Sequence, residues 1–417
     1  MRSLRLLFLL SHDKSCATYV RAYHLSKELA VRGHAVTLMI VSQHSKCRQS
    51  TTSESGLEIV ETPNFSHDIL GRLTSRLFFD DGTGILDIIA RIRRILHGQY
   101  DVVHTFDHSM NVAIPMYFLR GTTKTRFISD WCDVYYSPGG LRETYGYRLD
   151  RIYAKLGFPF RMYSKFIEVD LRRKADAVTV ISSGMSRFAV EHGVAGDKTF
   201  VVRGGADIDK VRPLAKIWAR RNLGFPEDGK IVGFMGTFQG DLDIAIQSIV
   251  SVRKEIPNSY LMVVGTPREG TRRLAEELGV GEALIEVGRC SDVLLPQYLA
   301  CADVLALPMR ANLPNETRWP NKIGEYMACG RPMVVSNVGD VAEVVARHRI
   351  GLAVEPGVEG FAAGIKALLM RTDAAEEMGT RARELACAEY SWSLVASELE
   401  KIYLQVIASK GVERLSA

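Results

Sequence analysis

Short apolar runs alternate with longer amphipathic stretches along most of this 417-residue chain. In YVRAYHLSKELAVRG (19–33), for example, apolar residues recur at intervals of three and four, which is typical of a helix with one buried face. We predict that the apolar runs are strands of a parallel sheet, because a helix between two strands returns the chain to the same sheet edge. In the first half of the chain these runs are 4–10, 34–41, 101–106, 125–131 and 176–182.

The same alternation starts again in the second half. The segment VVRGGADIDKVRP (201–213) is rich in glycine and ends in proline, which indicates a crossing between two domains. Segment 42–100 is less regular and predicts loops with one helix at 84–96. The fold class is therefore α/β, with two Rossmann-like domains of similar size and a cleft between them. The strands predicted in the second domain are 230–236, 260–265, 283–288, 303–309 and 351–356.

Composition is that of an ordinary globular protein, with 47% apolar and 24% charged residues. No stretch approaches the ~18 consecutive apolar residues of a membrane-spanning helix. The run 4–10 contains Arg5 and is followed by His12 and Asp13, so a buried first strand is a better interpretation than a signal peptide. The seven cysteines are scattered and form no CxxC pair, which favours a reducing, cytoplasmic setting.

Positive charge is concentrated in one segment. Residues 151–174 contain seven Lys and Arg against two acids, interleaved with aromatic residues, while the whole chain carries a net charge of only +5. Such a segment can lie on an anionic membrane, here the inner face of the plasma membrane, or it can be a packed helix with a charged outer face. Nucleic acid is a poor candidate partner, because only one patch is basic and no recognition motif accompanies it.

Several motifs of nucleotide and metal chemistry are missing. The chain has no P-loop, no GxGxxG after a strand and no HExxH, which argues against a P-loop nucleotidase, a dinucleotide cofactor and a zinc protease. Two DxD triplets occur, Asp207/Asp209 and Asp241/Asp243. Because such triplets are frequent by chance, we expect no metal and no cofactor.

The stretch WPNKIGEYMACGRPMVVSNVGD (319–340) is the most specific in the chain. It predicts a helix over 320–329 that begins with a proline in its first turn and ends at Gly330. The start of this helix would lie at the carboxyl edge of strand 303–309, where an anion is favoured. Lys322 would add positive charge there, and Glu325 could accept hydrogen bonds from ribose hydroxyls. The alternative is a solvated ion pair between these two residues.

This stretch resembles a known signature. PNKIGEYMACGRPMVVSNVGDVAEVV (320–345) is similar to the donor-binding signature of the GT-B glycosyltransferases, in particular the large retaining family four. The segments VVRGGADIDKVRP (201–213), GFMGTF (233–238) and YSWSLVASELEKIY (390–403) are similar to that family's hinge, to the first strand of its second domain and to its C-terminal helix, which returns to the first domain. The resemblance is specific over about 200–405 and looser over 1–200.

The resemblance implies an acceptor-side domain at 1–200, a nucleotide-sugar domain at 201–388 and a returning helix at 389–417. It implies transfer of a sugar from a nucleotide-diphosphate sugar to a hydroxyl of a carbohydrate or lipid-linked glycan, with retention and without a metal. Cell-surface polysaccharide or glycolipid assembly would be the setting. Glu325 would hold the ribose, and the helix start at Asn321 and Lys322 would hold the diphosphate. A nucleotide-sugar epimerase of the same fold and an inactive nucleotide-sugar-binding protein are the alternatives.

The sequence departs from the family pattern at three places. The first of the family's two glutamates, eight residues before Glu325, is replaced by Thr317 with Glu316 beside it. An Arg and a Lys that usually clamp the diphosphate are replaced by Thr237 and Gly240. The Gly-rich loop after the first strand is absent too. The nearby cations that would substitute for the clamp are Arg203, Arg318 and Lys322.

On the acceptor side, two predicted strands end in polar residues at the edge expected to face the ligand. Asp130 lies at the end of the strand 125–131 and Asp133 follows it, and either carboxylate could orient the sugar or take a proton from the acceptor hydroxyl. The alternative for both is a strand-end cap. His104 is expected to be structural, and Asp107 and His108 are lesser candidates.

Overall fold

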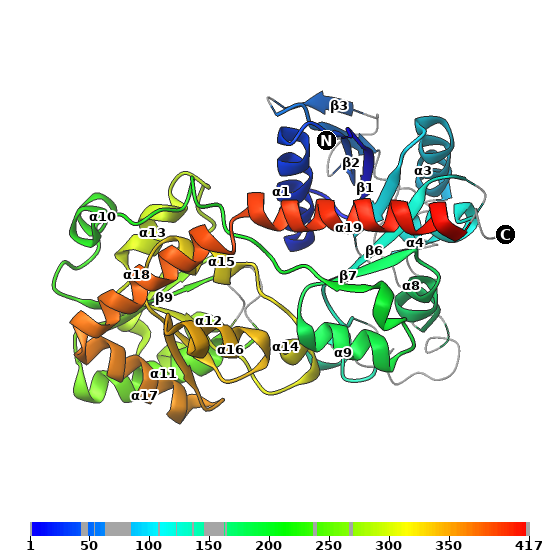
Figure 1. The fold of residues 1–417 in the computed structure, drawn as a ribbon. Coiled ribbons are helices and arrows are strands. Elements are labelled where there is room, and N and C mark those ends of the chain that lie inside the picture. Colours follow the sequence, from blue (N-terminus) through cyan, green and yellow to red (C-terminus); the bar gives the residue numbers. More distant parts are fainter. Residues whose placement is uncertain are drawn as a thin grey trace. The chain divides into compact units, whose positions relative to one another are not determined.

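The chain forms two compact units, both drawn in Figure 1. Unit 1 comprises Met1–Arg203 and Trp392–Ala417, and unit 2 comprises Gly204–Ser391. The computed structural model describes residues 2–42, 49–53, 55–62, 85–106, 109–121, 123–135, 137–145, 162, 165–236, 240–266 and 270–413.

Unit 1 is built on an eight-stranded sheet with the order β3-β4-β2-β1-β5-β6-β7-β8. All neighbours are parallel except β3, which runs antiparallel to β4 at one edge. The strand predicted first in the sequence, β1, lies inside the sheet and is paired on both sides. The strands are β1 (Arg5–Leu9), β2 (Ala35–Val41), β3 (Gln49–Thr52), β4 (Glu58–Thr62), β5 (Val102–Thr105), β6 (Arg126–Trp131), β7 (Ala177–Val180) and β8 (Thr199–Val201).

Helices connect these strands, as the alternating pattern predicts. One short π-helical turn, η2, precedes α8, and its backbone continues into that helix without a break. The helices described in unit 1 include α1 (Ala17–Val31), α3 (Ile85–Gly98), α4 (Met110–Leu119), α5 (Leu141–Tyr145), η2 (Phe166–Asp170), α8 (Leu171–Arg173), α9 (Ser183–Glu191) and α19 (Trp392–Glu413).

The C-terminal helix α19 packs on α1, although the two are separated by most of the sequence. The ring of His24 stacks on Trp392 with centroids 5.1 Å apart. Glu400 accepts a hydrogen bond from Arg32 at 2.6 Å and contacts the His34 ring at 3.0 Å. The predicted return of the C-terminal helix to the first half of the chain is confirmed.

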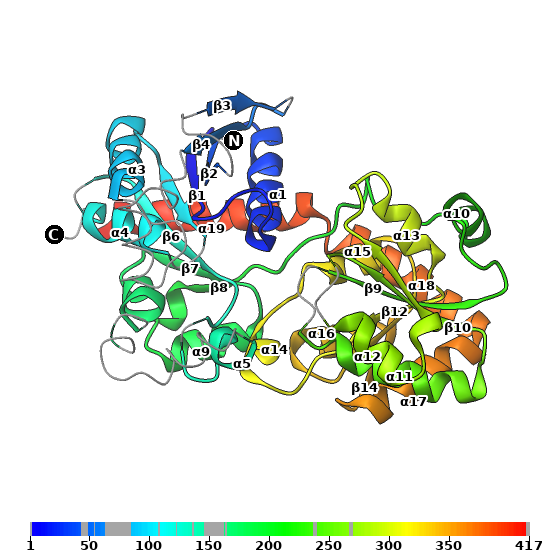
Figure 2. The same cartoon turned by 180° about the vertical axis from the view of Figure 1, so that it is seen from behind.

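Unit 2 holds a second, six-stranded parallel sheet with the order β11-β10-β9-β12-β13-β14. The strands are β9 (Lys230–Met235), β10 (Ser259–Val264), β11 (Leu284–Gly288), β12 (Val304–Leu307), β13 (Met333–Ser336) and β14 (Gly351–Val354). Helices α11 and α17 pack side by side, and their apolar faces join the core of the sheet (Figure 2). The helices are α10 (Lys216–Leu223), α11 (Leu242–Glu255), α12 (Thr271–Glu277), α13 (Leu295–Cys301), α14 (Leu313–Thr317), α15 (Lys322–Ala328), α16 (Gly339–His348), α17 (Val358–Met370) and α18 (Thr372–Ala388).

The predicted α/β class with two Rossmann-like sheets is confirmed, and the differences from the prediction are local. Strands β3 and β4 lie in segment 42–100, where loops and one helix were predicted. The five residues of β4 bury only two side chains, so the apolar pattern there is too short to recognise; β4 is fixed by pairing with β2. Helix α15 begins two residues later than predicted, because Pro320 and Asn321 form a turn before it.

Candidate functional site

Helix α15 is fixed to the carboxyl ends of two central strands of unit 2. The hydroxyl of Tyr326 accepts a hydrogen bond from the Met235 N–H at 2.9 Å and donates one to the Ala306 carbonyl at 3.1 Å. On the opposite side, a Cβ at Gly324 would lie 2.3 Å from the carbonyl oxygen of Gly205, so only glycine allows this approach. The start of α15 is therefore held at the sheet edge where open α/β domains bind ligands.

Lys322, the first residue of α15, is a cation in a desolvated position. Its ammonium nitrogen lies 4.0 Å from the centroid of the Phe234 ring on β9. Burial and, secondarily, the positive charge of Arg318 lower the pKa of Lys322 to about 7, against the smaller opposite effects of Asp241 and Glu325. A cation held in this way gains strongly from an anionic ligand.

Glu325 lies one turn further along α15. Burial, together with the negative charge of Asp207, raises the pKa of Glu325 to about 7, against the lowering effects of a backbone hydrogen bond, Lys210 and Lys322. Within the described residues, its buried Oε2 has no hydrogen-bond partner and it forms no ion pair with Lys322. The alternative of a solvated Lys–Glu pair is therefore wrong. A buried carboxylate oxygen without a partner costs free energy, and hydroxyl donors from a ligand would remove that cost.

A buried carboxylate organises the loop before α15. Asp241, 3% exposed, accepts hydrogen bonds from the backbone N–H and Nη1 of Arg310 at 3.2 and 2.7 Å, and from Asn315 Nδ2 at 2.8 Å. The Nη2 atom of Arg318 lies 4.0 Å from the same carboxylate. Arg310 also pairs with Asp243. This network places two guanidinium groups close to the start of α15.

The other donor-side residues predicted from the sequence have different surroundings. Asn321 is half-buried directly before α15, beside Gly204. Thr317 is buried, and its hydroxyl donates to the Leu313 carbonyl at 2.8 Å, whereas Glu316 is exposed. Thr237 lies outside the described residues, and Arg203 belongs to unit 1. The structure thus brings together Asn321, Lys322, Glu325 and Arg318.

Four residues of this site were not predicted from the sequence: Phe234, Arg310, Asn315 and Tyr326. Arg310 directly follows the predicted strand 303–309, and this position at a carboxyl edge is a signal that could have found it. The triplet Asp241/Asp243 was noted only as a weak metal motif. Phe234 and Tyr326 lie among ordinary apolar residues, so no pattern marks them.

In unit 1, Asp130 forms a buried ion pair with Arg21, and each residue is 1% exposed. Its carboxylate accepts from Arg21 Nε and Nη2 at 3.0 and 2.9 Å, from Thr179 Oγ1 at 2.6 Å and from Cys132 Sγ at 2.8 Å. Burial alone would raise the pKa of Asp130, but Arg21 holds it below its usual value. Both oxygens are occupied, which favours a structural role.

The neighbouring His104 extends the same buried network. Its Nδ1 contacts the Tyr403 hydroxyl of α19 at 2.6 Å, and its Nε2 contacts Thr179 Oγ1 at 3.0 Å. Burial lowers the pKa of His104 to about 3, so the ring is neutral at physiological pH. Its contacts agree with the structural role expected from the sequence.

Asp133 is half-buried in the loop after β6, and its backbone carbonyl accepts from Trp131 Nε1 at 3.0 Å. Glu168 holds this loop in place, because its carboxylate accepts hydrogen bonds from the N–H groups of Tyr135 and Ser137 at 2.5 and 2.7 Å. Asp107 and His108 lie outside the described residues.

Neither metal clusters nor spanning helices occur in the part of the chain that the structure describes. No group of three or more His, Cys, Asp or Glu residues is placed there to hold a metal ion. In the same described ranges, no helix combines the length and the apolar character that crossing a membrane requires.

Two family profiles match the chain. Residues 18–205 match the glycosyl transferase 4-like domain, and residues 229–371 match the glycosyl transferases group 1. The chain belongs to the group 1, GT-B glycosyltransferases. Group 1 membership agrees with the structure, because each profile covers most of one of the two sheets and the second includes α15.

Curated relatives of this group 1 protein match about half of it. A GDP-mannose-dependent alpha-(1-6)-phosphatidylinositol monomannoside mannosyltransferase of Mycobacterium tuberculosis is 30% identical over 235 residues, which are 54% of this chain and 60% of the relative. A D-inositol 3-phosphate glycosyltransferase of Corynebacterium urealyticum is 30% identical over 244 residues, 54% of this chain and 56% of the relative. The matches thus span less than two thirds of each relative.

Solved structures share the fold of the group 1 protein along its whole length. Sucrose-phosphate synthase from Thermosynechococcus elongatus has a TM-score of 0.74 at 20% identity, covering 98% of this chain and 100% of that one. The Anabaena protein HepE in complex with UDP-glucose has a TM-score of 0.72 at 17% identity, covering 97% and 100%. At these identities the likeness concerns the fold alone.

Proposed function

We propose that the protein transfers a hexosyl group from a nucleotide-diphosphate sugar to an acceptor hydroxyl. The observation that carries the proposal is the pair formed by Lys322 and Glu325 at the start of α15: a desolvated cation and, one turn later, a buried carboxylate oxygen without a partner. A diphosphate would pair with the ammonium group of Lys322, and a ribose hydroxyl would donate a hydrogen bond to Oε2 of Glu325. Membership of the group 1 family supports this assignment.

The roles proposed for the donor-site residues follow from the negative charge that develops on the leaving diphosphate. Transfer breaks the bond between the anomeric carbon and the diphosphate oxygen, and negative charge develops on the leaving diphosphate. Lys322 and Arg318 would stabilise that charge, while Glu325 would orient the nucleotide through its ribose. UDP- and GDP-hexoses are the donors to test first, because one relative is named as GDP-mannose-dependent and one similar structure holds UDP-glucose.

Transfer with retention and without a metal ion is the mechanism we propose. The acceptor oxygen would attack on the face from which the diphosphate leaves, and its proton would pass to the leaving diphosphate oxygen. Asp241 and Asp243 both bind Arg310, so these two acids supply no ready metal site. Arginine and lysine would then supply the positive charge that a divalent cation gives other transferases.

Unit 1 is proposed as the acceptor side, with a carbohydrate or lipid-linked glycan as acceptor. Of the two carboxylates at the end of β6 and just beyond it, Asp133 is the better candidate to orient the acceptor, because Asp130 is paired with Arg21. The names of two relatives include inositol lipids and inositol phosphate, which supports a hydroxylated acceptor of glycolipid type.

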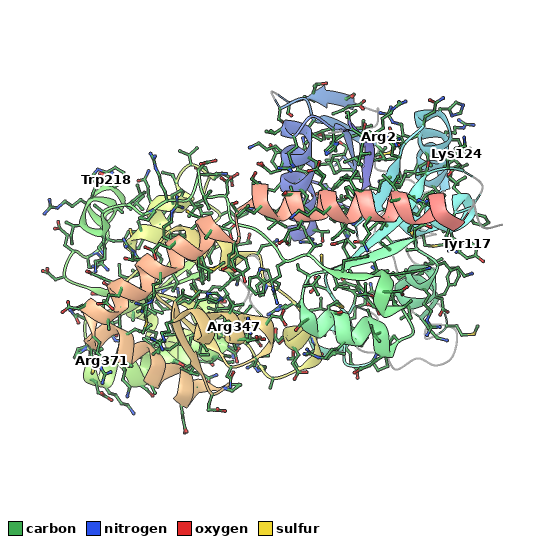
Figure 3. The ribbon with its side chains drawn as sticks, in the orientation of Figure 1. Arg2, Tyr117, Lys124, Trp218, Arg347 and Arg371 are labelled. Atoms are coloured by element: carbon green, nitrogen blue, oxygen red, sulfur yellow. The ribbon has the colours of Figure 1, made fainter. Side chains whose placement is uncertain are left out.

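Membrane contact was predicted through residues 151–174, of which 151–161, 163 and 164 lie outside the described residues. We propose that contact with an anionic membrane uses this segment together with an aromatic surface of unit 1. The rings of Tyr117 and Phe118 on α4 and Phe166 on η2 pack together and are all exposed. Figure 3 shows Tyr117 at the edge of the unit. Lys174 lies over the Tyr117 ring at 4.4 Å, and Lys165 is exposed nearby in sequence. Arg172, also in the basic segment, instead points inward onto Trp131. We call Tyr117, Phe118 and Phe166 the aromatic patch.

The experiment that tests the proposal is an assay with UDP- and GDP-hexoses in the presence and absence of a glycolipid extract. A transferase forms a new glycoside only when acceptor is present. With retention, NMR of the product would show the same anomeric configuration as in the donor. A new nucleotide-sugar without acceptor would instead identify an epimerase. Donor binding without any turnover would identify an inactive binding protein.

A further inference from the structure

A second polar site lies in unit 1, where helices α3 and α4 pack together. Asp87 on α3 accepts hydrogen bonds through Oδ2 from Arg91 Nε at 2.9 Å and from Asn111 Nδ2 of α4 at 2.8 Å. The side chains are almost fully covered, with exposures of 1% for Asp87 and 0% for Arg91 and Asn111.

Four polar atoms of this cluster have no hydrogen-bond partner in the part of the chain that the structure describes. They are Asp87 Oδ1, Arg91 Nη1, Arg91 Nη2 and Asn111 Oδ1. Each buried polar atom left without a partner costs about 1–3 kcal/mol. A fold rarely keeps four such atoms together unless something else occupies the place.

The position of the cluster is that of a ligand site. Helix α4 follows β5, so its first turn, with Asn111, lies at the carboxyl edge of the parallel sheet. Helix α3 precedes β5 and runs antiparallel to that strand, so the first turn of α3, with Asp87, lies at the same carboxyl edge. Ligands of open α/β domains bind at this edge.

The unpaired atoms define the ligand. The two terminal nitrogens of Arg91 donate, whereas Asp87 Oδ1 and Asn111 Oδ1 accept. Vicinal hydroxyl groups can pair with both the donor nitrogens and the acceptor oxygens, because each hydroxyl accepts one hydrogen bond and donates another. The charges of Asp87 and Arg91 already balance, so a bound anion would leave a net negative charge in a buried place. A neutral ligand would not.

We propose that Asp87, Arg91 and Asn111 form a subsite for a neutral polyhydroxylated ring, such as a sugar or cyclitol portion of the acceptor. This inference rests on the proposed transferase function and names the acceptor class of unit 1. Recognition comes from hydroxyl groups rather than from a phosphate.

The test uses methyl α-mannoside and myo-inositol as neutral probes and inorganic phosphate as the anionic probe, titrated into the full chain by calorimetry. Arg91→Lys keeps the charge and removes the guanidinium fork. Arg94→Lys is the matched control, since Arg94 lies on the same helix and its Nη2 is already paired with Glu58 at 2.6 Å. We expect a neutral probe to bind wild type and the control alike, and Arg91→Lys to weaken binding at least tenfold.

A second measurement holds even if Arg91→Lys fails to fold. Hydrogen exchange of the wild-type chain should slow in peptides covering the first turns of α3 and α4 when the neutral probe is added. Three outcomes would overturn the inference. A neutral probe could bind without this protection, or phosphate could bind instead. The third outcome is that neither neutral probe binds, because only water fills the cluster. Donor affinity, measured in the same samples, separates this outcome from failure of the nucleotide-sugar site.

Discussion

The ammonium group of Lys322 lies on the face of the Phe234 ring, 4.0 Å from its centroid. The ring comes from β9 and the cation from the first residue of α15, so the contact joins the strand and the helix that frame the donor site. An aromatic face only partly replaces water around an ammonium group. The charge on Lys322 therefore depends on whether an anionic ligand is bound.

The pKa of Lys322 predicts how the unliganded protein responds to pH. Its folded value of about 7 lies below its usual value, so between these values the unfolded chain holds the proton and the folded chain does not. Stability due to this group therefore rises with pH, by at most about 1.4 kcal/mol per pH unit. Replacing it, Lys322→Met, should stabilise the protein more near pH 6 than near pH 9. Denaturant unfolding at both pH values measures this; an equal effect would contradict it.

Glu325 should give the opposite trend. Its folded pKa of about 7 lies above its usual value, so the cost of burying its charge is fully present above pH 7, falls as the pH drops from 7 toward the usual value, and is absent below that value. The substitution Glu325→Gln should therefore stabilise the unliganded protein more near pH 8 than near pH 5. The same unfolding series measures it, and a stabilisation that is larger at low pH would be inconsistent with a buried, unpaired carboxylate.

Asp241 and Asp243 offer a matched pair of substitutions around one arginine. Asp241→Asn removes a buried charge that holds Arg310 and Asn315, and should cost about 1–3 kcal/mol of unfolding free energy and weaken donor binding. Asp243→Asn removes a more exposed partner of the same Arg310 and should cost under about 1 kcal/mol. Chemical denaturation and donor titration of both variants provide the comparison. Equal losses would show that the buried network has no special role.

On the acceptor side, substitution of Asp130 in β6 should affect stability, and substitution of Asp133 after β6 should affect activity. Asp130→Asn leaves Arg21 buried beside a neutral partner and should lower stability by about 3–5 kcal/mol. Asp133→Asn should change stability by less than about 1 kcal/mol and lower the turnover number with KM for the donor unchanged. If Asp130→Asn folds normally and is inactive, the catalytic role predicted from the sequence for Asp130 is restored.

Membrane contact should depend on the aromatic patch. Phe118 is 63% exposed, and full burial of a Phe side chain is worth about 1.5–3 kcal/mol, of which a large part is available when the exposed ring enters a bilayer. Phe118→Asp should therefore reduce flotation with phosphatidylglycerol vesicles about tenfold or more. The control is Trp218→Asp on α10 of unit 2, 48% exposed and labelled with Tyr117 in Figure 3. Unchanged flotation of Phe118→Asp, or an equal loss in the control, would exclude the patch.

The elements that could be predicted from the sequence are those that one local pattern marks. Outside segment 42–100 the apolar runs located every strand of the two sheets except β8 and β13, which have only three and four residues. The stretch 319–340 located α15 with Lys322 and Glu325. Asp241 and its partner Asn315 are 74 residues apart, and Arg21 and Asp130 are 109 apart, so no local pattern could pair them. The orphan atoms of Asp87, Arg91 and Asn111 depend on side-chain directions that periodicity does not give.

The affinity of the protein for nucleotide-sugars is the quantity that tests the donor site most directly. Calorimetric titration of UDP-glucose and GDP-mannose should compare wild type, Glu325→Gln and the control Glu343→Gln, which alters an exposed residue of α16 paired with Arg347. The donor that binds wild type should bind Glu325→Gln at least tenfold more weakly, a loss of about 1.4 kcal/mol, and bind the control unchanged. Its 2′- and 3′-deoxyribose analogues should bind wild type and Glu325→Gln more equally. A change of less than about twofold for Glu325→Gln, under ~0.4 kcal/mol, would contradict the assignment of Glu325 to the ribose.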